Sequence, residues 1–278
     1  MQRYRFGWLR PTFLYSAILL FLFWTLAPVL WIAMMSIQPE INYVSVPPRL
    51  SLGDISLRWY GDMLAQPDFL NALRSSTIVA GVTTVVCLYF GALAAYPLAR
   101  LNIPNKNLFL ILSVVSRMMP AMVLIIPMFL LLRNLRLLDR YLGLVIVYSS
   151  FLLPYVIWML KNFFEQVPPA LESAARMDGC SRLGSLFRIM IPVTAPGIVA
   201  TAIFAFIGAW NEFLFGLILS TNRAVPATVR LSSLVSTTFH SDNSLVAAAG
   251  MLTLIPPVLL VFILNRFIIR GLVEGVKF

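Results

Sequence analysis

Residues 172–192 read ESAARMDGCSRLGSLFRIMIP and lie between two long apolar stretches of the chain. The segment mixes small residues, charged side chains and two glycines, and it ends at Pro192. A segment of this mixed polarity is unsuited to the hydrocarbon core of a bilayer, whereas the flanking stretches suit it well. The segment therefore predicts a connection that lies outside the membrane between two spans.

The same segment contains signals for two short helices. Pro168 and Pro169 can open the first helix, because the first helical position needs no N–H donor, and Gly179 can close it in a left-handed conformation. Ser181 is a suitable N-cap for the second helix. The α-helical spacing in that second helix predicts one shared apolar face formed by Leu183, Leu186, Phe187 and Met190.

The first of these helices has a surface suited to close contact. Ala174, Ala175 and Gly179 allow another backbone to approach, while Glu172 and Asp178 supply charge. Two interpretations remain open from the residues alone: a docking element for another protein, or an amphipathic helix that lies on the lipid surface.

The composition identifies the class of protein. Of 278 residues, 60% are hydrophobic and 12% are charged, and the mean hydropathy is +0.87, whereas soluble domains are roughly half apolar and a quarter charged. The formal net charge of +10 does not indicate nucleic-acid binding, because the Lys and Arg residues fall mainly between apolar runs. There they can set orientation and meet anionic lipid.

The apolar runs predict an all-α integral membrane protein with a single permease domain over residues 1–278. The six predicted spans cover residues 12–36, 71–99, 108–132, 141–164, 195–220 and 245–268. Twelve Lys and Arg residues fall on the side of the N-terminus and seven on the other side, so both termini are expected to be cytoplasmic. The segment of about residues 168–192, between spans four and five, is then cytoplasmic, and the outer loop 37–70 is expected to contain a short helix near residues 56–64.

The segment resembles the EAA motif of binding-protein-dependent ABC importer permeases. The similarity rests on Ala174-Ala175, Asp178-Gly179 and Ile191-Pro192, with the Gly-to-Pro interval of the motif. Four further stretches are similar to the smaller permease of maltose-type carbohydrate importers: GALAAYPLARL (91–101), PYVIWMLKNFFEQVPPALE (154–172), IFAFIGAWNEFLF (203–215) and RGLVEGVKF (270–278).

Two positions depart from the motif. Ser173 stands where the motif has Glu, with Glu172 one residue earlier, and Ile191 stands where Leu is usual. One residue along a helix corresponds to a rotation of about 100°, so Glu172 does not automatically take the place of the missing carboxylate. The resemblance implies that the segment docks on an ATPase through Glu172, Ser173, Ala174, Ala175, Asp178, Gly179, Leu183, Leu186 and Phe187.

The chain lacks the parts of an ATPase. The phosphate-binding loop of such enzymes needs Lys followed by Ser or Thr, but Lys106, Lys161 and Lys277 are followed by Asn, Asn and Phe. We therefore expect no enzyme activity and no bound cofactor in this chain, with ATP and Mg²⁺ on a separate subunit. His240 is the sole histidine, and Cys87 and Cys180 are far apart, so no metal site is indicated.

The resemblance also implies partners and a location in a prokaryotic cytoplasmic (inner) membrane. The partners are a homologous larger permease in a heterodimer, an ATPase dimer, an extracytoplasmic solute-binding protein and the lipid bilayer. Ionisable and aromatic residues within the spans are pathway candidates, with an interhelical polar clamp as the alternative: Arg117, Trp210, Asn211 and Glu212. Glu274, Gly275 and Lys277 are candidate contacts of the C-terminal tail with the ATPase.

The predicted function is import of a sugar or sugar-like solute by alternating access, driven by ATP hydrolysis on the partner. An ion-coupled secondary transporter or channel that uses Arg117 and Glu212 as relay groups is the alternative. A membrane scaffold without transport activity is a third possibility. The residues do not distinguish a sugar from a glycerol phosphodiester or related polyol.

Overall fold

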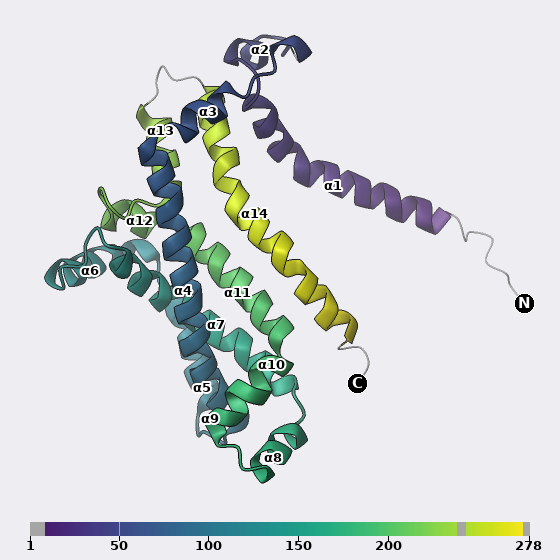
Figure 1. Cartoon of the computed structure of the whole chain (residues 1–278), viewed down its shortest axis with the longest axis vertical. Coiled ribbons are helices and arrows are strands. Elements are labelled where there is room, and N and C mark those ends of the chain that lie inside the picture. Colours follow the sequence, from purple (N-terminus) through teal and green to yellow (C-terminus); the bar gives the residue numbers. More distant parts are fainter. Residues whose placement is uncertain (1–8, 50, 238–242, 275–278) are drawn as a thin grey trace, which may run out of the picture. The chain divides into compact units, whose positions relative to one another are not determined.

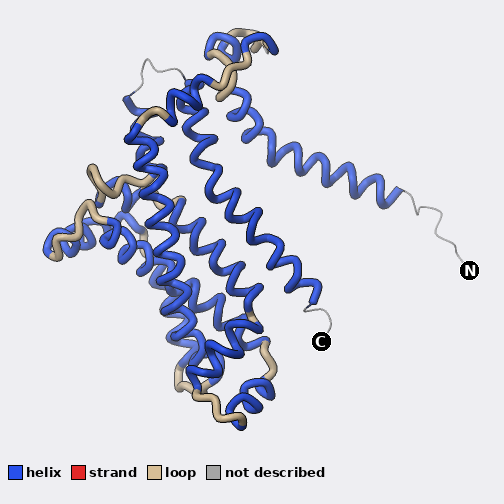
Figure 2. Tube along the Cα trace, in the orientation of Figure 1, coloured by secondary structure: helices blue, strands red, loops and turns tan. Residues whose placement is uncertain are grey.

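The computed structural model describes residues 9–49, 51–237 and 243–274, and these residues form helices and connecting loops without a β-strand (Figures 1 and 2). The chain divides into two compact units. The first comprises Met1–Pro67 with Ser233–Thr253, and the second comprises Asp68–Ser232 with Leu254–Phe278.

The first unit begins with a long apolar helix and a loop of short helices. Its elements are α1 (Leu9–Met35), α2 (Glu40–Val44), a 3₁₀ turn (Leu52–Asp54), α3 (Arg58–Leu64), the last part of α13 (Ala227–Thr237) and the first part of α14 (Asn243–Glu274). The short helix expected near residues 56–64 is confirmed as α3. Hydrogen bonds join the loop to α14: the side-chain amide of Asn243 donates to Glu40 (2.6 Å), and the Ser244 hydroxyl donates to the carbonyl oxygen of Gln38 (2.7 Å).

The second unit contains long helices and the short helices formed by residues 168–192. In chain order its elements are α4 (Pro67–Arg100), α5 (Lys106–Val115), a 3₁₀ turn (Ser116–Met118), α6 (Ala121–Asn134), α7 (Tyr141–Gln166), α8 (Pro169–Met177), α9 (Arg182–Ser185), a π turn (Leu186–Met190), α10 (Ile191–Val193), α11 (Ala195–Trp210), α12 (Leu214–Leu219), the first part of α13 and the last part of α14.

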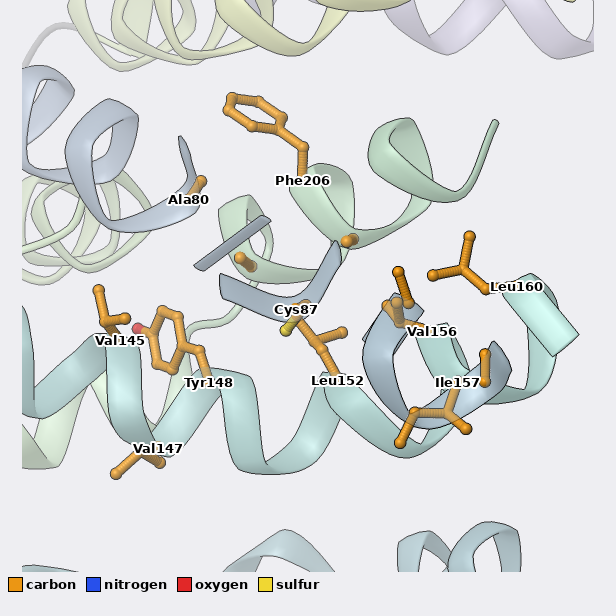
Figure 3. Packing of buried hydrophobic residues seen from close by; sticks show 14 of the residues in the cluster. Ala80, Cys87, Val145, Val147, Tyr148, Leu152, Val156, Ile157, Leu160 and Phe206 are labelled. Atoms are coloured by element: carbon orange, nitrogen blue, oxygen red, sulfur yellow. The ribbon is translucent and has the colours of Figure 1, made fainter. Parts of the chain in front are cut away.

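The core of the second unit lies where α4, α7 and α11 pack together. Figure 3 shows Cys87 of α4 beside Leu152 of α7, with Val156 and Leu160 further along the same helix. Gly91 allows this close packing, because a Cβ atom at that position would come within 2.7 Å of the Val156 side chain. Small residues at helix crossings are the usual means by which membrane helices approach closely.

The structure confirms an all-helical membrane protein, although two predicted spans are interrupted. Four described helices, α1, α4, α7 and α14, are long and apolar enough to cross a membrane, and a fifth span results if the bent pair Arg182–Val193 and Ala195–Trp210 counts as one. The predicted third span is divided into α5, a 3₁₀ turn and α6. The predicted fifth span is divided between α11 and α12, with residues 211–213 outside both helices.

The interruption of the third span has a local cause. Met119 precedes Pro120 and is extended, with φ −65° and ψ 127°, which is the conformation that a following proline favours sterically. Pro127, Pro154 and Pro256 instead lie inside helices. The mainly apolar composition of residues 108–132 predicted one span, and the stop before Pro120 divides it into two helices.

Candidate functional site

The turn after α8 has the geometry that its sequence predicts. Gly179 has φ +86°, its N–H donates to the carbonyl oxygen of Arg176 (3.1 Å), and the N–H of Cys180 donates to that of Ala175 (3.0 Å). These two bonds form a Schellman motif, which satisfies carbonyl groups left open at the helix end. The predicted left-handed closure at Gly179 is confirmed.

The next helix begins as its sequence predicts. Ser181 is extended (φ −68°, ψ 166°), and its hydroxyl oxygen accepts a hydrogen bond from the N–H of Gly184 (3.1 Å). This bond caps α9. The chain then passes through the π turn and α10, and it bends by 84° before α11.

The predicted shared apolar face of this second helix is wrong. Leu186 and Met190 are fully buried, whereas Leu183 and Phe187 are 59% and 45% exposed. The π turn holds more residues per turn than an α-helix, so the α-helical spacing assumed for these positions does not apply across residues 186–190. Leu186 and Met190 anchor the segment to the rest of its unit, whereas Leu183 and Phe187 face outward.

Burial divides the candidate docking residues into a buried pair, six exposed residues and Glu172, which is partly buried. Ala175 and Leu186 are buried, so they support the segment from within. The exposed candidates are Ser173, Ala174, Asp178, Gly179, Leu183 and Phe187.

Sequence reasoning missed Met177, whose side chain is 84% exposed. Its place immediately before Asp178-Gly179, at the end of a short helix, was an available signal for exposure. We call Met177, Leu183 and Phe187 the exposed apolar triplet.

Glu172 lies against the helices of its own chain. Its carboxylate is 3.1 Å from Nε of Arg100, and the side chains of these two residues are 14% and 9% exposed. Its other oxygen accepts a hydrogen bond from the hydroxyl of Tyr96 (2.5 Å). Ser173, at the position where the motif has Glu, is exposed, and its hydroxyl donates to the carbonyl oxygen of Pro169 (3.2 Å).

The pathway candidates of the fifth span lie at the break between α11 and α12. An oxygen of the Glu212 carboxylate accepts from the N–H of Phe215 (3.1 Å), and the Glu212 carbonyl oxygen accepts from the Thr228 hydroxyl (3.3 Å). Trp210 is buried and stacks on Phe206, with ring centroids 5.6 Å apart. Of the three candidates Trp210, Asn211 and Glu212, Asn211 is the exposed one.

Other predicted residues lie wholly or partly outside the described part of the chain. The backbone of Arg117 belongs to the 3₁₀ turn Ser116–Met118, but its side chain lies outside the described residues. His240, Gly275 and Lys277 also lie outside them, as does the side chain of Glu274, whose backbone ends α14. Among the described residues, no cluster of His, Cys, Asp or Glu side chains could hold a metal ion.

Asp139, in the connection between α6 and α7, has a carboxylate that is bound by backbone N–H groups of a distant loop. One oxygen of Asp139 accepts from the N–H groups of Thr221, Asn222, Arg223 and Ala224, at 2.9–3.2 Å. The N–H of Asp139 in turn donates to the carbonyl oxygen of Leu219 (2.9 Å). Partial burial raises the pKa of the Asp139 carboxyl, but the backbone donors lower it by more, and the pKa lies below its ordinary value.

Comparisons with known proteins define the class. Residues 87–274 match the model of the family described as "Binding-protein-dependent transport system inner membrane component". This match covers more than half of the chain, which therefore belongs to that family of ABC transporter permeases. It is a multi-pass protein of the inner membrane.

Individual relatives support this membership over nearly the full length. The trehalose transport system permease protein SugB of Mycobacterium tuberculosis is 34% identical over 257 residues, covering 91% of this chain and 92% of SugB. The sulfoquinovosyl glycerol transport system permease protein SmoH of Agrobacterium fabrum is 32% identical, covering 90% and 88%. A bacterial ABC transporter involved in the import of the acidic polysaccharide alginate has the same fold, with a TM-score of 0.74 at 24% identity over 96% of this chain and 98% of that chain.

Proposed function

We propose that this chain forms half of the translocation pathway of a carbohydrate importer. Residues 168–192 couple it to the conformational changes of a separate ATPase. The supporting observation is the exposed apolar triplet Met177, Leu183 and Phe187, held beside a Schellman turn in the segment that resembles the family motif. The buried Leu186 and Met190 anchor this surface, so a force applied to it reaches the rest of its unit.

The proposal includes six spans with both termini in the cytoplasm, in a single permease domain. The charge distribution of the loops supports this orientation. Spans three and five are each built from two helices in this arrangement, α5 with α6 and α11 with α12. Broken helices within the membrane are tolerated where their open backbone groups face protein or a water-filled cavity.

The proposed partners are a homologous second permease, two ATPase subunits that bind ATP and Mg²⁺, and an extracytoplasmic binding protein. The binding protein docks on the outer loops, ATP closes the ATPase dimer, and movement of α8 opens the pathway outward. Hydrolysis then resets the complex. Each ligand must favour one state over the other for this coupling to occur. In this proposal the tail residues Glu274, Gly275 and Lys277 extend toward the ATPase.

The names of the relatives support a sugar or sugar-containing solute. SugB and SmoH are named for trehalose and sulfoquinovosyl glycerol, so a glycoside of similar size is the proposed substrate class. Asn211, with its exposed amide, is the described pathway candidate best placed to donate to a solute.

The decisive experiment is reconstitution of the complex in proteoliposomes. We expect ATP hydrolysis to rise when the binding protein and its sugar are added, and ATP to drive sugar uptake. A panel of disaccharides and glycosyl glycerols identifies the substrate. Uptake by this chain alone along an ion gradient, with no dependence on ATP, would instead establish the secondary transporter that six spans also permit.

A further inference from the structure

Arg100, the last residue of α4, contacts three other elements through one guanidinium group. Its Nη2 donates to the carbonyl oxygen of Val167 (2.6 Å), the residue that follows α7, and to Sδ of Met190 (3.6 Å) in the π turn. Its Nε lies 3.1 Å from the carboxylate of Glu172 on α8, an ion-pair contact without hydrogen-bond alignment. One side chain thus joins α4 to α7, α8 and the π turn.

Tyr96 adds a second contact between α4 and α8. It lies one helical turn before Arg100, so both side chains project from the same face of α4. Its hydroxyl bonds one oxygen of Glu172, while Arg100 approaches the other. Both oxygens of the α8 carboxylate are therefore engaged by α4.

Burial makes the loss of either charged partner in this cluster costly. Arg100 and Glu172 are largely removed from solvent, where an ion pair is weakly screened and loss of one partner leaves an uncompensated charge. The planar guanidinium can serve several acceptors in fixed directions, which a lysine cannot. The geometry resists sliding of α8 along α4.

We propose that Tyr96, Arg100 and Glu172 form an internal joint that makes α8 move together with α4 and α7. The inference rests on the proposed docking of an ATPase on residues 168–192. It identifies the contacts that transmit movement of α8 to α4 and α7. Glu172 is then a positioning residue within the chain, and the ATPase contacts the exposed apolar triplet instead.

The chain offers a matched control carboxylate. Glu165, in the last turn of α7, pairs with Lys161 at 2.8 Å within one helix, and its side chain is 39% exposed. Glu165 is the exposed partner, whereas the Lys161 side chain is 13% exposed, and the pair lies within one helix and joins no second element. Glu165→Gln removes a carboxylate near the same end of α7 without touching the joint.

The test uses the full complex with Arg100→Gln, Glu172→Gln, the double variant and the Glu165→Gln control. Three quantities are measured: ATPase subunits that co-purify, ATP hydrolysed, and solute imported per ATP. We expect both single variants to retain the subunits and to import roughly tenfold less solute per ATP, a typical coupling effect. The double variant should be no worse than the poorer single one, because both remove the same interaction. Glu165→Gln should match the wild type.

Two results would overturn the joint. One is wild-type import per ATP in both single variants; the other is loss of ATPase subunits from Glu172→Gln but not from Arg100→Gln, which would make Glu172 a direct ATPase contact. Should Arg100→Gln fail to fold, Arg100→Lys retains the charge and is expected to recover part of the coupling, while Glu172→Gln is nearly isosteric. Failure of the proposed function is distinguishable, because then the wild-type complex itself would show no ATP-driven import.

Discussion

At the residue scale, Gly179 shows why the predicted turn depends on one residue type. Its φ of +86° is a conformation that residues with a side chain rarely adopt. A Cβ atom added there would meet no atom within 4 Å. The requirement for glycine in this chain is therefore conformational, without a steric clash with neighbouring side chains.

A series of substitutions separates strain from charge at this position. Asn and Asp tolerate the left-handed region better than Ala, which should lose roughly 1–2 kcal/mol there. We expect ATP-driven uptake to remain highest in Gly179→Asn and to be abolished in Gly179→Asp, where a carboxylate enters the docking surface. Gly179→Ala should be intermediate, with a lowered unfolding temperature. Equal uptake in the Asn and Asp variants would contradict the role of charge.

Also at the residue scale, substitutions of Glu212 can show whether this charged residue within a span serves transport or structure. Because its carboxylate accepts a hydrogen bond from the N–H of Phe215 in the first turn of α12, Glu212→Ala should destabilise the protein by about 1 kcal/mol. Glu212→Gln retains an acceptor oxygen and should unfold and transport almost as the wild type does. Thermal unfolding in detergent and uptake are measured on both variants. A transport defect in Glu212→Gln with unchanged unfolding would favour a pathway role.

At the element scale, Asp139 ties the α6–α7 connection to the loop that follows α12. Four successive N–H groups of residues 221–224 converge on one oxygen of this carboxylate, an arrangement that favours its charged form. Two connections that are about eighty residues apart in sequence are thereby held together.

This tie predicts a pH dependence with a defined sign. Because the pKa of Asp139 is lowered in the folded state, its contribution to stability is present above the unfolded value of about 3.9 and is lost as the pH falls through the folded value. Asp139→Asn keeps the shape and tolerates the φ of 55°. The unfolding temperatures of wild type and variant should differ at pH 7 and draw together as the pH falls from about 4 through the folded pKa; a constant difference would contradict the assignment.

At the scale of the whole molecule, the orientation of the spans can be tested with the native cysteines. Cys87 is fully buried, whereas Cys180 follows Gly179 and is partly exposed. With both termini in the cytoplasm, Cys180 lies inside and the loop containing Asn222 lies outside.

A membrane-impermeant maleimide distinguishes the two sides. In intact spheroplasts we expect no labelling of the wild-type chain and strong labelling of Asn222→Cys placed in a Cys180→Ser background. After permeabilisation, Cys180 should also react. The reverse pattern would establish the opposite orientation. Cys180→Ser alone, with Cys87 buried, is the control for background labelling.

Sequence by itself determined the features that depend on neighbouring residues. The apolar runs predicted the positions of α1, α4, α7 and α14, because an uninterrupted apolar helix can cross a bilayer without any partner. Gly179 and Ser181 predicted a turn and a cap, since both signals act within four residues. The motif around Ala174-Ala175 and Gly179 indicated the family, which the comparisons confirmed.

Tertiary structure alone decided which side chains of the segment face inward. Sequence placed Leu183 and Leu186 on one face, but the π turn and the packing of its unit bury only Leu186. Likewise, the partner of Glu172 is Arg100, more than seventy residues earlier. No local pattern specifies such a contact, because it exists only once α4, α7 and α8 have packed and excluded water from the charges between them.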